Sequence, residues 1–251
     1  MAESEGAAEQ SSPKVSEGMN LKALVIGGTG ATGKSLIGEL LSAKNFAKVI
    51  ALGRRNATVP EQYNVDQAEA EKEGRLVQVT VDFETLTKES VAEHFQDGDV
   101  FFNTFGTQRN KAGSAEAFFK IDHDYPMKCI KIAKECGVKH VSVVTSNYAK
   151  ADSRLLYLKT KGQIEEDCKK LEFERVSIIR PGLLGRGPDA KMSEKFFGFF
   201  FKAIQVTDIA KAMRIDAENV AKTLKSGETS GMEKCRIFFN ADVWNMIKDV
   251  E

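Results

Sequence analysis

Short apolar runs alternate along the chain with longer stretches in which apolar residues recur at helical spacing. The runs have the length of buried strands and lie at 23–26, 48–52, 76–81, 99–103, 140–144 and 175–179. The helical stretches between them include 34–41, 114–136 and 155–171. Strands that alternate with helices favour βαβ units. We therefore expect an α/β fold, a Rossmann-type doubly wound parallel sheet.

The two ends of the sequence depart from this alternation. Residues 1–19 are mostly Ala, Glu, Ser, Gly and Gln, and such a segment buries too little apolar surface to offset its ordering entropy, so we expect a disordered tail. Residues 20–251 are expected to form a single domain. From about residue 183 the pattern loosens into a Gly-rich loop, a Phe-rich stretch at 196–201 and helical spacing near 208–224. A short strand at 236–239 and a last helix from about residue 241 follow, which predicts a small C-terminal lobe.

Composition excludes several classes of partner. The 36 Lys and Arg balance 36 Asp and Glu, and this zero formal net charge gives no electrostatic reason to expect nucleic acid. The four cysteines are scattered without metal-ligand spacing, so we expect no metal site. Their thiols are expected to be reduced, as in a cytoplasmic protein. Nuclear or peripheral organelle association stays open. No apolar run is long enough for a transmembrane segment.

A glycine-rich turn joins the first predicted strand to the first predicted helix. Gly27, Gly30 and Gly33 have the spacing G-x-x-G-x-x-G, a variant of the dinucleotide-binding turn. The glycines allow a tight turn, a close approach of backbone to a pyrophosphate and close packing of helix on strand. The N–H groups at the helix start then face the phosphates. We therefore predict cofactor contacts from the three glycines and from the residues between them, Thr29, Ala31 and Thr32.

The same stretch also fits a phosphate-binding Walker loop, because Gly28 precedes Gly33-Lys34-Ser35 by the required interval. A P-loop protein also needs an acidic residue at the end of an apolar strand. Asp82 follows a strand that is only half apolar, and Asp99 begins one. This alternative is therefore the weaker of the two.

The end of the second predicted strand indicates which dinucleotide is bound. An NAD-preferring enzyme places a carboxylate there, whereas this chain has Gly53, Arg54 and Arg55. Two guanidinium groups suit a 2′-phosphate, which predicts NADP(H), although arginines on a solvated turn would look the same. After the third strand, Asp82 could accept a hydrogen bond from the adenine with Phe83 beside the ring, or Asp82 could cap a helix.

A tyrosine and a lysine four residues apart follow the fifth predicted strand. Tyr157 and Lys161 lie on one helical face, so the ammonium group favours the phenolate and lets the tyrosine pass a proton to a substrate oxygen. Thr145 and Ser146 end the strand and could orient a carbonyl group. Ser146 is the residue that we assign to catalysis with Tyr157 and Lys161, and Thr145 stays open as the alternative hydroxyl.

These motifs together resemble the short-chain dehydrogenase/reductase superfamily. More narrowly, the chain is similar to its atypical branch, the Tat-interacting-protein-type oxidoreductases. Further segments carry the likeness, which covers about residues 21–200: Val81–Glu84, Gly106–Gly113, Asp122–Tyr125, Phe173–Ser177, Arg180–Gly182 and Lys195–Gly198.

The resemblance implies NADP(H) bound across the strand ends and a Ser/Thr–Tyr–Lys reduction site. Lys161 would also hold the nicotinamide ribose, and Gly106, Thr107, Pro181 and Gly182 would contact the cofactor. The expected function is that of an NADPH-dependent oxidoreductase that reduces a small carbonyl compound. The alternative is an NADP(H)-binding regulatory protein with little or no turnover, which would bind a protein partner through the Phe-rich stretch.

Overall fold

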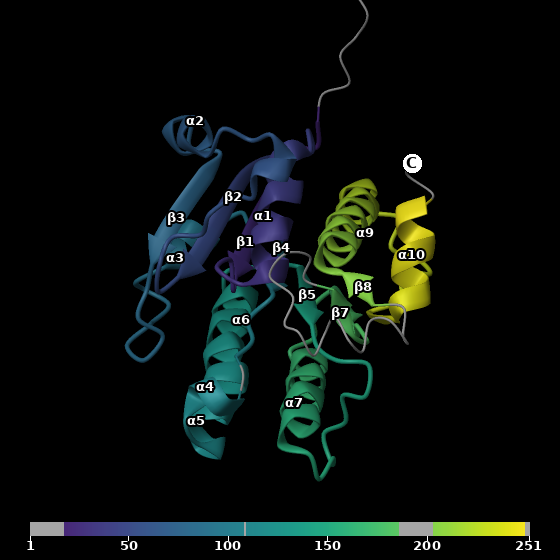
Figure 1. Cartoon of the computed structure of the whole chain (residues 1–251). Coiled ribbons are helices and arrows are strands. Elements are labelled where there is room, and N and C mark those ends of the chain that lie inside the picture. The colour runs from purple at the N-terminus through teal and green to yellow at the C-terminus, as the bar shows by residue number, and fades with distance from the viewer. Residues whose placement is uncertain (1–17, 108, 186–202, 249–251) are drawn as a thin grey trace, which may run out of the picture.

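The computed structural model describes residues 18–107, 109–185 and 203–248 (Figure 1). Residues 1–17 of the predicted tail and the Phe-rich stretch at 196–201 lie outside the described residues.

The described chain is built around a seven-stranded sheet in the order β3-β2-β1-β4-β5-β6-β9, in which every neighbouring pair is parallel. This confirms the predicted Rossmann-type fold. A short parallel pair, β7 with β8, forms a second sheet. The strands are β1 (Leu21–Ile26), β2 (Phe46–Gly53), β3 (Leu76–Thr80), β4 (Val100–Asn103), β5 (His140–Val144), β6 (Arg175–Ile179), β7 (Leu184–Gly185), β8 (Ile204–Gln205) and β9 (Cys235–Phe238).

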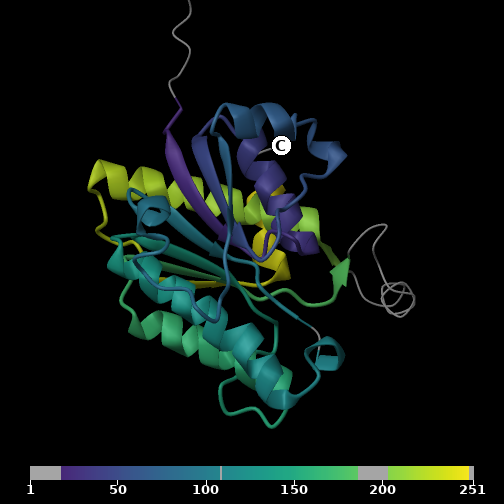
Figure 2. The ribbon, with the colours of Figure 1, turned by 90° about the vertical axis from the view of Figure 1, so that its left-hand side faces the viewer.

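Helices cover both faces of the sheet, because alternate side chains of each buried strand point to opposite sides. Along β1, Ala23 and Val25 pack in one core with α1, α9 and α10, whereas Leu24 and Ile26 pack in a second core with α6 and α7. Figure 2 shows these helix layers on either side of the strands. The helices are α1 (Ala31–Ser42), α2 (Gln67–Lys72), α3 (Ala92–Phe95), α4 (Arg109–Ala112), α5 (Ala115–Phe119), α6 (Tyr125–Glu135), α7 (Leu156–Lys170), α9 (Val206–Ser226) and α10 (Asn240–Lys248), and η1 (Glu61–Tyr63) is a 3-10 turn.

The strand order reverses between β1 and β4. The chain runs outward through β2 and β3 on one side of this point and through β5, β6 and β9 on the other. In open parallel sheets the crevice beyond the carboxyl ends of the strands at such a reversal is where ligands bind. The fold therefore places the glycine turn after β1 and the polar residues after β4 and β5 around one crevice.

The stretch predicted as one helix at 114–136 is interrupted by a π-helical segment, η2 (Lys120–Asp124), between α5 and α6. Pro126 follows this segment in the first turn of α6 and has no N–H to donate to the carbonyl of Asp122, four residues earlier. The N–H of Tyr125 instead bonds to the carbonyl of Lys120, five residues back. The extra residue in this turn leaves the Asp122 side chain fully buried.

The described part of the chain after residue 183 adds to the main sheet. Strand β9 pairs with β6, and α9 packs on α1 and on β5 and β6, with α10 against α9. A short strand and a last helix are predicted there, and β9 and α10 confirm them. No helix in the described ranges has both the length and the apolar composition needed to cross a bilayer.

A buried polar cluster lies at the amino ends of β5 and β6, opposite the crevice. His140 Nε2 lies 3.0 Å from Ser177 Oγ and 3.5 Å from an oxygen of Asp216, which comes from α9. Arg175 donates to Ser177 Oγ at 3.0 Å and to Asp216 at 3.3 Å. Burial, reinforced by the charge of Arg175, lowers the pKa of His140 from 6.5 to about 3. The imidazole is therefore neutral in the folded protein at neutral pH.

We predict that His140 makes the protein less stable in mild acid. Its pKa is lower in the folded than in the unfolded chain, so the unfolded chain binds the extra proton and stability falls as pH drops below about 6.5. Between pH 7.5 and pH 5.0 this linkage amounts to about 2 kcal/mol. Urea unfolding at both pH values should find that His140→Gln loses less stability than wild type on acidification. The partly exposed His94 provides a control, and equal acid sensitivity of the His140 and His94 variants would contradict the assignment.

Candidate functional site

The turn after β1 is as tight as its glycine spacing predicts. Gly27 has φ +83°, and a Cβ there would lie 2.6 Å from the carbonyl carbon of Thr104. A Cβ on Gly33 would collide with the carbonyl of Gly27 and lie 2.7 Å from Thr104 Oγ1. The Gly30 N–H closes the turn on the Gly27 carbonyl at 2.9 Å. Only glycine at 27 and 33 allows β1, α1 and the end of β4 to approach this closely.

The N-terminus of α1 opens toward the crevice with its positive end uncompensated. Gly30 is the N-cap, no side chain caps the helix, and no acidic residue lies in the first turn. The first N–H groups of a helix have no intrahelical partner and favour an anion. Lys34, which a Walker loop would use to reach a phosphate, is absent from the residues lining the cavity here, and this weighs against the P-loop alternative.

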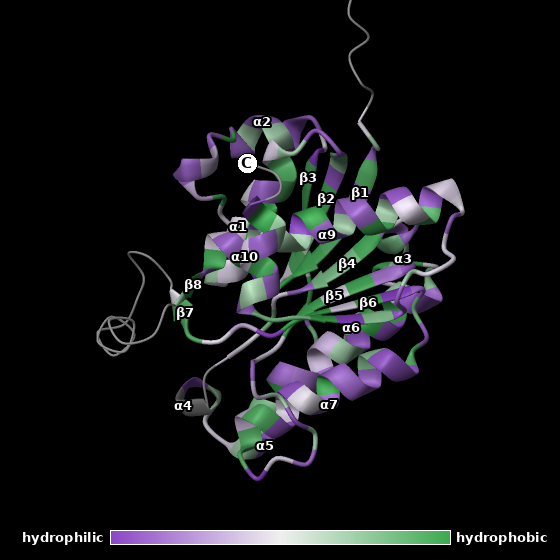
Figure 3. Cartoon of the chain, turned by 90° about the vertical axis from the view of Figure 1, so that its right-hand side faces the viewer, coloured by the Kyte–Doolittle hydropathy of each residue, from purple (hydrophilic) through white to green (hydrophobic). Residues whose placement is uncertain are grey.

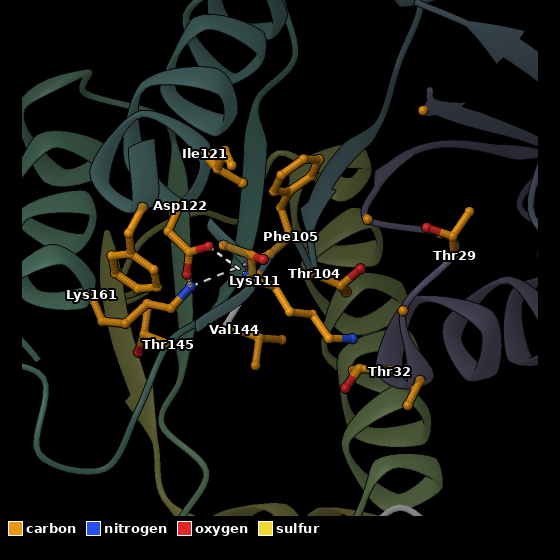
Figure 4. A pocket seen from close by; sticks show the side chains of 18 of the residues that line it. Thr29, Thr32, Thr104, Phe105, Lys111, Ile121, Asp122, Val144, Thr145 and Lys161 are labelled. Carbon is orange, nitrogen blue, oxygen red and sulfur yellow. Dashed lines mark hydrogen bonds and ion pairs between the residues drawn. The ribbon is translucent and has the colours of Figure 1, made fainter. Parts of the chain in front are cut away.

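A cavity of about 1050 Å³ extends along the carboxyl ends of β1, β2, β4 and β5. At one end it is lined by the glycine turn and by Arg54 and Arg55, both exposed. At the other end it reaches the start of α7. Figure 4 shows residues of α1, α4, η2, β5 and α7 around this space, with the Lys111 side chain extended toward the side where Thr32 lies.

The two residues after β3 differ in their relation to the cavity. Phe83 lines it with its ring buried, edge-on to Phe105 with ring centroids 5.2 Å apart and stacked on Tyr125 at 5.5 Å. Asp82 is exposed and does not line the cavity; its Oδ1 accepts the backbone N–H of Glu84 at 3.0 Å. Asp82 thus caps a local turn, close to the alternative considered for it.

Lys161 lies in the wall of the cavity and is held by a buried carboxylate. Its Nζ lies 3.0 Å from Asp122 Oδ2 and donates to the carbonyl of Phe105 at 3.3 Å. The other oxygen of Asp122 accepts the Thr107 N–H at 2.6 Å. The Lys161 side chain is 5% exposed and that of Asp122 0%. This ion pair ties α7 to η2 and to the loop after β4 (Figure 4).

Tyr157 lies in the first turn of α7, four residues before Lys161, and both side chains line the cavity. The tyrosine is 45% exposed and tilts over Phe118, with ring centroids 6.4 Å apart. Helical geometry puts the phenol and the ammonium on one face of α7.

Of the two hydroxyl groups after β5, Thr145 lines the cavity and Ser146 does not. Thr145 Oγ1 donates to Glu165 Oε1 at 2.6 Å, and Arg180 Nε donates to the same oxygen at 3.0 Å. Glu165 is buried one turn beyond Lys161 on α7. Its hydrogen bonds raise the pKa of Arg180. The threonine is therefore held by a buried ion pair behind the cavity wall.

Most of the predicted site residues come together at this cavity. Those that line it are Gly27, Thr29, Gly30, Ala31, Thr32, Arg54, Arg55, Phe83, Gly106, Thr107, Tyr157 and Lys161. Those that do not are Gly33, Asp82, Ser146, Pro181 and Gly182. The last two brace neighbouring loops: the Pro181 carbonyl accepts the Asn147 N–H at 2.9 Å, and the Gly182 N–H donates to Asn240 at 3.0 Å.

Sequence reasoning missed the roles of Asp122 and Glu165. Asp122 belongs to a motif that supports the family resemblance, but its pairing with Lys161 depends on the π-helical turn. Glu165 continues the four-residue spacing of Tyr157 and Lys161, a signal that was available. Within residues 18–107, 109–185 and 203–248, no cluster of three His, Cys, Asp or Glu side chains could hold a metal ion.

Residues 27–224 match a family model described as NAD(P)H-binding. The chain belongs to this NAD(P)H-binding family. Protein HTATIP2 of Rattus norvegicus is 38% identical over 185 residues, 71% of each chain. The mitochondrial protein FMP52 of Meyerozyma guilliermondii is 33% identical over 164 residues, 65% of each chain. These relatives confirm the resemblance to atypical short-chain dehydrogenases/reductases.

Two solved structures with the same fold hold NAD. MoeE5 in complex with UDP-glucose and NAD has a TM-score of 0.61 at 15% identity, covering 87% of this chain and 75% of that one. The dTDP-glucose 4,6-dehydratase DesIV of Streptomyces venezuelae, with NAD and TYD bound, has a TM-score of 0.60 at 14% identity, covering 87% and 84%. At this identity the likeness supports the fold alone.

We predict that the buried ion pair stabilises the fold strongly. Asp122→Leu leaves the Lys161 ammonium buried without its carboxylate, which costs about 3–5 kcal/mol in the free energy of unfolding. Asp152→Leu is the control, because its pair with Lys150 is exposed, with side chains 74% and 73% accessible. Urea unfolding of both variants gives the comparison. Similar small losses in the two variants would mean that the Lys161–Asp122 contact is not a buried ion pair in solution.

Proposed function

We propose that this chain is an NADPH-dependent reductase of a carbonyl compound. The observation that carries the proposal is the continuity of one cavity. It joins a glycine turn and two arginines at one end to Tyr157, Lys161 and Thr145 at the other. A dinucleotide that spans it would bring its nicotinamide to the only stretch of the described lining where a phenol, an ammonium group and a hydroxyl group meet.

The cofactor end fits NADP(H) in both charge and shape. Gly27 and Gly33 form a cradle that a Cβ would fill, and the open start of α1 offers N–H groups to the pyrophosphate. Arg54 and Arg55 would hold the 2′-phosphate, and Lys111 would add a third cation near the turn. The single carboxylate in the described lining, Asp122, is paired with Lys161 at the far end.

We predict that Arg54 and Arg55 determine the preference for NADPH. Arg54→Ala with Arg55→Ala removes two charge-assisted contacts to the 2′-phosphate, each worth about 1.5–3 kcal/mol. The Kd for NADPH should rise at least about tenfold, and the Kd for NADH should change little. Fluorescence titration of both dinucleotides measures this, and Arg236→Ala, which changes an exposed arginine of β9 outside the cavity lining, is the control. Parallel weakening of NADPH and NADH would reject the 2′-phosphate contact.

At the catalytic end, Tyr157 is the proton donor. NADPH held in this cavity would supply the hydride for the carbonyl carbon, which would give an alcohol and NADP⁺. The Tyr157 phenol gives its proton to the carbonyl oxygen, and the positive charge of Lys161 favours the phenolate left behind. Asp122 and the Phe105 carbonyl hold the Lys161 ammonium in place, where it can also bind the nicotinamide ribose.

Thr145 is the hydroxyl that we assign to the carbonyl oxygen, in place of Ser146. The reason is that Thr145 lines the cavity, whereas Ser146 does not. In the substrate-free arrangement the Thr145 hydrogen goes to Glu165, so donation to substrate requires an exchange of this hydrogen bond. While Thr145 donates to the substrate, Glu165 keeps a hydrogen bond from Arg180, because Arg180 donates to the same carboxylate oxygen.

We predict that Tyr157→Phe lowers kcat about 10²–10⁴-fold and leaves the Kd for NADPH unchanged, because only the proton donor is lost. Tyr148→Phe, an exposed tyrosine outside the cavity, is the control. The pair Thr145→Val and Ser146→Ala distinguishes the two hydroxyl groups, and we expect the first to lose turnover and the second to keep it. Full turnover by Tyr157→Phe on a confirmed substrate would reject the assigned role.

The alternative is an NADP(H)-binding protein that regulates a partner and has little turnover. Its expected partner surface, the Phe-rich stretch, lies outside the described residues. Selective NADPH binding without reduction of any compound in a broad carbonyl panel would favour this alternative.

We also propose a cytoplasmic location. The FMP52 relatives carry the word mitochondrial in their names, so fractionation of cells is needed to distinguish the two compartments.

A further inference from the structure

We propose that the substrate is an uncharged, lipophilic aldehyde or ketone. This inference rests on the proposed function and specifies what enters the same site. It follows from the chemistry of the cavity wall beyond Lys161, called here the substrate end, where the described lining is apolar and carries no net charge.

Apolar side chains from several elements converge on the substrate end. Phe118 and Ile121 come from α5 and η2, Leu155, Leu156 and Leu158 from the start of α7 and its N-cap, and Leu184 from β7. Figure 3 colours α5 mostly as hydrophobic, beside the first turn of α7, and the contact between Phe118 and Tyr157 joins the two. These side chains line the same cavity as the phenol of Tyr157, where the carbonyl group would react.

The charges in the described lining are divided unequally between the two ends. Arg54, Arg55 and Lys111 lie toward the cofactor end. At the substrate end the charged groups of the described lining are Lys161 and Asp122, and their 3.0 Å contact neutralises them as a pair. An anionic substrate would lose water there without gaining a free cation from the described lining, which costs binding energy.

The mouth of the substrate end exposes apolar surface that a ligand could cover. Leu155 is 66% exposed and Tyr157 is 45% exposed, although both line the cavity. A lipophilic chain placed along them removes their surface, and its own, from water. A nucleotide sugar such as the UDP-glucose bound to MoeE5 instead carries a diphosphate, for which the described wall of this end offers no unpaired cation.

The first experiment measures steady-state reduction by the full-length protein with saturating NADPH. The substrates are butanal, hexanal and octanal, with 8-oxooctanoate as an anionic aldehyde as long as octanal. Each added methylene that reaches the wall should raise kcat/KM by about fourfold. Octanal should exceed 8-oxooctanoate by at least about tenfold. Equal kcat/KM along the series, or a preference for the anionic aldehyde, would overturn the proposal.

A matched pair of variants tests whether the wall itself is responsible. Leu155→Asp places a charge on the exposed wall and should lower kcat/KM for octanal at least about tenfold, with butanal much less affected. Tyr148→Asp makes the same kind of change in the same loop, at a residue that is 74% exposed and does not line the cavity, and should leave both values unchanged. Equal effects of the two variants would reject the assigned wall.

A binding measurement separates this inference from the proposed reaction. With NADP⁺ and 2-octanone no reduction can occur, because both are oxidised, yet the apolar ketone should still raise the melting temperature of the NADP⁺ complex. Leu155→Asp should lose this shift, and UDP-glucose should give none. If NADPH binds but no aldehyde is reduced, the proposed function fails, and the 2-octanone shift alone decides the inference. A shift with UDP-glucose and none with 2-octanone would overturn it.

Discussion

The close approach of three backbone segments at the reversal of strand order is the constraint on which the rest of the structure depends. Gly27 at the end of β1, Gly33 in α1 and Thr104 after β4 leave no room for a Cβ at either glycine. Thr104 also bonds through its hydroxyl to the carbonyl of Ile26 at 2.8 Å. Because the first turn of α1 is held against both strands, its free N–H groups are fixed at the crevice where a dinucleotide binds.

A second fixed element, α7, lies on the other side of this crevice. Tyr157, Lys161 and Glu165 recur every four residues along it, and each reaches a different partner. Tyr157 opens to the cavity, Lys161 pairs with Asp122, and Glu165 binds Thr145 and Arg180. One helical face therefore sets the positions of the Tyr157 phenol, the Lys161 ammonium group and the Thr145 hydroxyl group. Asp122 fixes the position of the ammonium group, and Glu165, paired with Arg180, fixes that of the hydroxyl group.

The sequence was sufficient where local patterns decide the structure. Strands β5 and β6 match their predicted bounds, because an apolar run between polar turns specifies a buried parallel strand. The glycine turn could also be predicted from the sequence, because a dinucleotide-binding turn requires a fixed spacing of glycines. The role of Asp82 could not, because a carboxylate after a strand can either face a ligand or cap a turn. The hydrogen bond from the Glu84 N–H to Asp82 shows that it caps a turn.

Long-range pairing could not be predicted in the same way. The choice between Thr145 and Ser146 depends on which of the two side chains faces α7 at the end of β5. Successive side chains of a strand point to opposite faces, so a shift of one residue would exchange them. Asp122 meets Lys161 from a π-helical turn that lies inside a stretch whose apolar spacing predicts an uninterrupted helix. Both features arise from contacts between segments far apart in the sequence, and apolar periodicity carries no information on them.

The most direct test of this account is a calorimetric titration of the wild-type protein with NADPH, NADH and ATP under identical conditions. A cavity with a glycine cradle at one end and two exposed arginines beside it predicts that NADPH binds at least about tenfold more tightly than NADH. It also predicts that ATP binds weakly. Equal affinity for NADPH and NADH would contradict the role of Arg54 and Arg55. Tight binding of ATP with neither dinucleotide bound would contradict the account as a whole.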